Sequence, residues 1–143
     1  MDGVLGNLPE ESGVDEKATS IRVLMCFNAA FMDIFDGKFE EACAKLRDVQ
    51  KYKPANIVAA NNIATCQVFC NQTGRAIDIL MDLIKGDRIA NLNEQVIANL
   101  MSFYEVYYPA TVSDHKKTLL DICSKSSKDA VNAAMYIQNV QSN

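Results

Sequence analysis

The five cysteines and the single histidine of the sequence are its first candidates for a metal site. Cys66 and Cys70 are four residues apart, which places them on one face of a helix, and His115 with Cys26 could complete a ligand set. Closed zinc sites usually use tighter paired spacings, and no Cys-x-x-Cys pair is present. We therefore expect no metal ion and no cofactor. The odd number of cysteines fits a reducing compartment, so we expect five free thiols packed as small apolar side chains.

The sequence has no arrangement of residues typical of a catalytic centre. One histidine excludes most acid–base pairs built on imidazole. The glycines Gly37, Gly74 and Gly86 stand alone, so there is no glycine-rich phosphate loop. Neighbouring carboxylates such as Glu40 and Glu41 fit a solvated helix face, and a pI near 4.9 argues against a nucleic-acid-binding surface. We expect neither an enzyme nor a small-molecule substrate, and no nucleic-acid partner.

Side-chain amides are the first candidates for binding a polypeptide. Asn28, Asn62 and Asn99 recur at spacings of 34 and 37 residues. Each amide offers a donor and an acceptor that match a peptide unit. Two interpretations stay open: the amides grip the backbone of an extended partner segment, or they satisfy the backbone of a neighbouring helix.

An aromatic stripe is the second candidate for partner binding. Phe27, Phe31 and Phe35 follow one another every four residues, so they share a helix face. The stripe either packs inside its own hairpin or anchors a partner, because the first unit of a repeat array has no preceding neighbour to cover it.

The elements that must position these side chains follow from an internal repeat. Shifting the chain by 34 residues superimposes identical residues at helical spacing, in two clusters separated by a turn. No segment shows sustained period-two alternation, so we expect no sheet. The pattern predicts antiparallel helix pairs. The superimposed identities are Asn28–Asn62, Ala30–Ala64, Phe35–Phe69, Ala42–Ala76, Leu46–Leu80 and Asp48–Asp82.

Six helices in three pairs are predicted, followed by a seventh. The first has about 18 residues and ends at Asp36-Gly37, because glycine fits the left-handed position after a helix. Asn91 is expected to cap the fifth helix, and Ser113 or Asp114 the sixth. The other predicted ranges are 38–53, 55–71, 73–85, 91–108 and 113–123, and the apolar face of the seventh helix is Ala130, Val131, Ala134 and Ile137.

Charge divides the 143-residue chain into two parts. The first sixteen residues hold five acids and no base, the opposite of a secretory signal. We expect residues 1–17 to form an acidic, disordered leader and residues 18–140 to form one helical domain. The apolar stretch Val23–Phe35 is interrupted by Asn28 and Asp33 and is too short for a membrane span.

Within the 34-residue period the residues resemble the tetratricopeptide-repeat family. The second repeat differs from the family pattern at Asn71, which stands at the glycine position, and at Thr73 and Arg88. The resemblance implies an all-α fold, a superhelical array of about three helical hairpins with a C-terminal capping helix. The matching positions are Ala30, Gly37, Phe39, Ala42, Leu46 and Pro54 in the first repeat, and Ala64, Ala76 and Leu80 in the second.

The family resemblance implies that the first helices of the pairs line a concave groove. Two functions are then open, a scaffold subunit and a co-chaperone that binds acidic C-terminal tails. The co-chaperone needs a lysine or arginine in the groove to pair with a terminal carboxylate, which the candidate residues do not supply. The candidate partner-binding residues are Phe27, Asn28, Phe31, Asn61, Asn62, Thr65 and Asn99.

A narrower resemblance rests on Asn61-Asn62-Ile63-Ala64-Thr65-Cys66 and continues through Asn99-Leu100 and Tyr104-Glu105. This pattern is similar to that of tetratricopeptide subunits of a vesicle-tethering complex. The resemblance implies a non-catalytic scaffold in endoplasmic reticulum-to-Golgi transport, with autophagy as an open second process. Its partners would be other subunits of the complex. It would act in the cytoplasm, peripheral to endoplasmic reticulum–Golgi membranes and without inserting into them.

Overall fold

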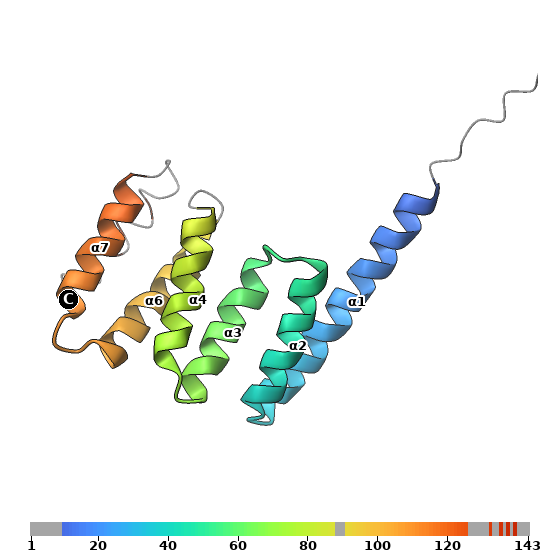
Figure 1. The fold of residues 1–143 in the computed structure, drawn as a ribbon, viewed down its shortest axis with the longest axis horizontal. Coiled ribbons are helices and arrows are strands. Elements are labelled where there is room, and N and C mark those ends of the chain that lie inside the picture. Colours follow the sequence, from blue (N-terminus) through green and yellow to red (C-terminus); the bar gives the residue numbers. More distant parts are fainter. Residues whose placement is uncertain are drawn as a thin grey trace, which may run out of the picture.

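The computed structural model describes residues 10–87 and 91–125, together with Asn132, Met135, Ile137 and Asn139. Within these residues every regular element is a helix, and each helix contacts the next along the chain, so the array grows as a row of antiparallel hairpins (Figure 1). The predicted all-α array of helical hairpins is confirmed. The helices are α1 (Glu10–Phe35), α2 (Phe39–Tyr52), α3 (Ile57–Phe69), α4 (Thr73–Gly86), α6 (Glu94–Tyr107) and α7 (Val112–Ser124).

Small residues at equivalent positions allow the helices to pack closely. Ala30 in α1 and Ala64 in α3 have no exposed surface, and neither do Ala42 in α2 and Ala76 in α4. An alanine at a helix crossing lets the backbones approach, and larger side chains fill the adjoining space. The apolar residues of two core clusters follow this plan, one across α1, α2 and α3 and the other across α3, α4, α6 and α7.

The turns of the first two hairpins have the same backbone conformation although their sequences differ. Gly37 has φ 75° and Asn71, which occupies the glycine position of the second repeat, has φ 58°. Asparagine is among the few residues other than glycine that adopt this left-handed conformation. The departure from the family pattern at Asn71 therefore leaves the turn geometry intact.

This geometry predicts opposite effects for two substitutions at Asn71. We expect Asn71→Gly to raise the free energy of unfolding by about 0.5–1 kcal/mol, whereas Asn71→Ala lowers it by about 1 kcal/mol because alanine is strained at positive φ. Chemical denaturation measures both. Gln72→Ala is the matched control, because Gln72 has φ −117° and makes no capping hydrogen bond. A less stable Asn71→Gly variant would contradict the prediction.

The first helix is longer than expected. Residues 10–17, which the sequence assigned to a disordered leader, are the opening turns of α1, and residues 1–9 lie outside the described part of the chain. The physical reason is that extending a helix already held by packing needs no new nucleus.

The capping predictions for the later helices are wrong. Asn93, in extended conformation, caps α6 by accepting a hydrogen bond from the Val96 amide at 3.0 Å. Asn91 instead lies buried and donates through Nδ2 to the Leu83 carbonyl at 2.7 Å, which ties it to α4. Thr111 precedes α7 without a side-chain capping bond, so neither Ser113 nor Asp114 caps that helix.

The predicted seventh helix falls mostly outside the described residues. Ala130, Val131 and Ala134 are among those not described. Ile137 is helical and fully buried in the cluster formed with Leu119 of α7. Of the four residues predicted for the apolar face of this helix, Ile137 is the one described, and its burial agrees with the prediction.

Candidate functional site

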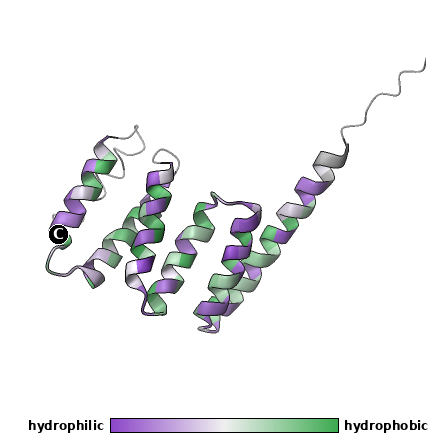
Figure 2. Cartoon of the chain, viewed as in Figure 1, coloured by the Kyte–Doolittle hydropathy of each residue, from purple (hydrophilic) through white to green (hydrophobic). Residues whose placement is uncertain are grey.

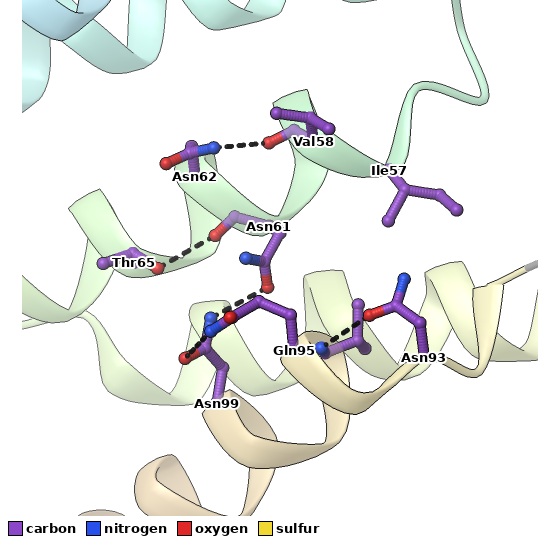
Figure 3. Close-up of a pocket in the computed structure, with 9 residues that line it drawn as sticks. Ile57, Val58, Asn61, Asn62, Thr65, Asn93, Gln95 and Asn99 are labelled. Atoms are coloured by element: carbon purple, nitrogen blue, oxygen red, sulfur yellow. Dashed lines mark hydrogen bonds between the residues drawn. The ribbon is translucent and has the colours of Figure 1, made fainter. Parts of the chain in front are cut away.

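A pocket of about 450 Å³ opens between α3 and α6, the first helices of the second and third hairpins (Figure 3). Polar side chains from both helices face each other across it, and both helices also contribute apolar side chains. The lining residues are Ile57, Val58, Asn61, Asn62, Thr65, Asn93, Gln95, Val96 and Asn99.

Each wall of the pocket is fixed by a capped helix start and a buried back face. The Asn56 side chain caps α3 by accepting from the Ala59 amide at 2.8 Å, as Asn93 does for α6. Ile63 and Leu100 are buried at equivalent positions on the back faces of the two helices. Because these faces are held in the core, the amide-bearing faces of α3 and α6 must point outward.

A hydrogen bond joins the two walls directly. Asn99 Nδ2 donates to Asn61 Oδ1 at 2.9 Å, and Gln95 Nε2 approaches Asn99 Oδ1 at 3.5 Å (Figure 3). Asn62 Nδ2 donates to the Val58 carbonyl of its own helix at 2.8 Å. Among the described residues these bonds leave the Asn61 Nδ2 donor and the Asn62 Oδ1 acceptor uncommitted, and together they match the groups of one peptide unit.

The pocket brings together four of the predicted partner-binding residues, namely Asn61, Asn62, Thr65 and Asn99. Sequence reasoning missed its remaining lining residues, among them Val58 and Gln95. A signal for these two was available, because each lies one helical turn before a repeated asparagine. Extending the repeat alignment by four residues would have found them.

The three predicted residues on α1 are not among the lining residues of this pocket. Asn28 is exposed and lies outside the pocket, so of the three repeated amides only Asn62 and Asn99 line it. Phe27 is partly buried against both clusters that α1 forms with α2 and α3. Phe31 is 44% exposed and stacks on Phe27 with ring centroids 5.8 Å apart. The contacts of Phe27 fit the other interpretation that the sequence left open, in which the stripe packs inside its own hairpin.

The cysteines and the histidine lie in separate packing environments. Cys66 is buried between α2 and α3, and burial, with the nearby Cys43 as a lesser cause, raises its pKa from 9.0 to about 12. His115 stacks on Tyr108 with ring centroids 4.0 Å apart. Within the part of the chain that the structure describes, no three potential ligands lie close enough to hold a metal ion. All five thiols are unpaired.

Fold and pocket together define a helical-hairpin array with an amide-lined groove. No family model matches the chain. The chain is 25% identical over 111 residues to trafficking protein particle complex subunit 12 from Homo sapiens, and equally to the Mus musculus protein. The alignment covers 78% of this chain but 15% and 14% of those relatives. The chain therefore resembles that subunit, as the pattern in residues 61–66 predicted.

Proposed function

We propose that this chain is a non-catalytic interaction subunit of a vesicle-tethering complex in endoplasmic reticulum-to-Golgi transport. In this role it acts in the cytoplasm at the membrane periphery, with other subunits of the complex as partners. Support comes from the likeness to a trafficking complex subunit and from the pocket between α3 and α6. The observation that carries the proposal is the Asn99–Asn61 bond, which orients amides from two hairpins toward one binding surface.

The pocket suits an extended segment of a partner protein. The Asn61 Nδ2 donor and the Asn62 Oδ1 acceptor would bind one peptide unit of that segment, as a neighbouring backbone would. Ile57, Val58 and Val96 provide apolar surface for its side chains. Two rigid helices present these groups, so little ordering of the receptor opposes binding.

The competing co-chaperone function has less support. Recognition of a terminal carboxylate requires charge-assisted hydrogen bonds from lysine or arginine. The nine described residues that line the pocket include neither. Neutral amides favour an internal peptide segment over a free carboxyl terminus.

Co-precipitation of the tagged chain from cell lysate, with identification of bound proteins by mass spectrometry, tests the proposed function. We expect tethering-complex subunits with the wild type, and at least a tenfold lower recovery with Asn61→Ala/Asn99→Ala, equivalent to about 1.4 kcal/mol. Removing both members of the Asn61–Asn99 pair leaves only the amide of Gln95 without its partner, and because Gln95 is exposed, water replaces that contact and the fold should persist.

The matched control is Ser102→Ala, because Ser102 is exposed on α6 and bonds only to its own helix. It should recover partners as the wild type does. Undiminished recovery by the double variant would reject the pocket as the binding surface. Recovery of chaperones in place of tethering subunits would favour the co-chaperone function.

A further inference from the structure

One face of α1 is apolar and exposed along most of the helix. Ile21 is 50% exposed, Met25 66%, Met32 62% and Phe35 86%. The opposite face of the same helix packs into the array through Val23 and other buried residues. In Figure 2 the part of α1 that lies beside α2 is coloured mainly as apolar, and the outer part mainly as polar. These exposed side chains therefore belong to a face that the array itself leaves uncovered.

Six of the exposed residues of α1 follow the spacing of a coiled-coil seam, and two further exposed apolar residues, Leu24 and Phe31, lie on one side of it. Successive steps along the six alternate between three and four residues, which is the a/d pattern of a heptad repeat. The single polar member is Asn28, at the middle of the row. One amide in such a row fixes register and the number of strands at some cost in stability. We call this set the α1 seam, and its members are Ala18, Ile21, Met25, Asn28, Met32 and Phe35.

The repeat alignment shows that part of the α1 seam is the kind of surface that is buried elsewhere in the chain. Met25 aligns with Ala59 of α3 and with Val96 of α6, and both of these are fully buried. Met32 aligns with Cys66 and Phe103, which are 1% and 7% exposed. In α3 and α6 the preceding hairpin covers these positions. At these positions the α1 seam therefore corresponds to the surface through which each later hairpin packs on the one before it.

Helix length identifies what covers the seam. The α1 helix has 26 residues, and the other described helices have 13 or 14. The α1 seam runs from Ala18 to Phe35, so a second helix of hairpin length would leave its end uncovered, whereas another α1 matches the whole seam. We propose that two copies of this chain associate through their α1 seams, forming a symmetric dimer by helix–helix packing with Asn28 at its centre.

A membrane surface is the competing occupant. The segment Asp15–Phe35 is long and apolar enough to cross a membrane by length and composition, a test that core helices of soluble proteins also pass. Two observations oppose it. Asp33 is buried and paired with Lys45 of α2, which holds the helix in the array. The α1 sequence contains five acids and two bases, whereas helices that bind membrane surfaces are rich in lysine and arginine.

Light scattering coupled to size-exclusion chromatography tests the dimer with the purified full chain. The monomer mass is 15.8 kDa, and we expect the measured mass to approach twice this value as concentration rises through the micromolar range typical of small interfaces. Met25→Glu/Met32→Glu should weaken association by about a thousandfold, because two central anchors are lost, and should stay monomeric with unchanged helicity. Asn28→Leu should bind more tightly and form larger species, because the amide that fixes the number of strands is lost.

The matched control is Val106→Glu, because Val106 is 67% exposed on α6, away from the seam. It should dimerise as the wild type does. A wild-type chain that stays monomeric to several hundred micromolar overturns the proposal. So does a monomer that floats with phosphatidylcholine vesicles, since the seam would then bind lipid. A folded Met25→Glu/Met32→Glu variant that still forms dimers also overturns the proposal. This result would not depend on which proteins co-precipitate with the chain.

Discussion

Replacing Phe27 by serine is expected to lower the free energy of unfolding of the isolated chain by about 3 kcal/mol. Phe27 packs against two clusters, one that contains Ala30 and Leu46 and one that contains Val23 and Val49. Serine would leave a cavity at the junction of these clusters and would place a hydroxyl in it. For a domain of this size the loss corresponds to a fall in Tm of about 10 °C.

A thermal melt followed by circular dichroism measures the effect. Phe35→Ser is the matched control, with the same substitution in the same helix at a residue that is 86% exposed. Below the concentrations at which the chain associates, it should change stability by no more than about 0.5 kcal/mol. Equal melting temperatures for Phe27→Ser and the wild type would contradict the packing role and restore Phe27 as a candidate partner anchor.

Alkaline pH is expected to destabilise the chain by several kcal/mol. Burial raises the pKa of Cys66 from 9.0 to about 12 and that of Cys123 from 9.0 to about 11. Burial likewise raises the pKa of Tyr104 from 10.0 to about 12. The unfolded chain releases these protons first, so it binds fewer protons than the folded chain above pH 9. Stability is therefore full below about pH 9 and falls as pH rises toward 12.

Denaturant titrations at pH 8 and pH 11 measure this loss, with each pKa unit worth about 1.4 kcal/mol. Tyr104→Phe removes one titrating group but keeps the ring, so its stability should fall less over the same interval.

A thiol assay at pH 8 adds a second readout. We expect five reactive thiols in denaturant and fewer in the folded chain. Equal stability at pH 8 and 11, or fewer than five thiols after unfolding, would contradict the prediction.

The sequence by itself determined the helical hairpins and their turns. Helical periodicity and the 34-residue repeat are properties of neighbouring residues, so they predicted α2, α3 and α4 to within about two residues. Asn71 could replace glycine in the second turn because its left-handed conformation is a local property. The alanines at helix crossings were identified for the same reason, since each repeats with the period of the hairpin that it holds together.

Only the tertiary structure decided which side chains face outward and which meet. Phe27, Phe31 and Phe35 look alike in sequence, but the rotation of α1 against the helices it packs on partly buries the first and leaves the last exposed. Asn99 bonds to Asn61 rather than to its repeat equivalent Asn62, a pairing that depends on how α6 is rotated against α3. Such rotations depend on packing between residues distant in the chain, and no local pattern encodes them.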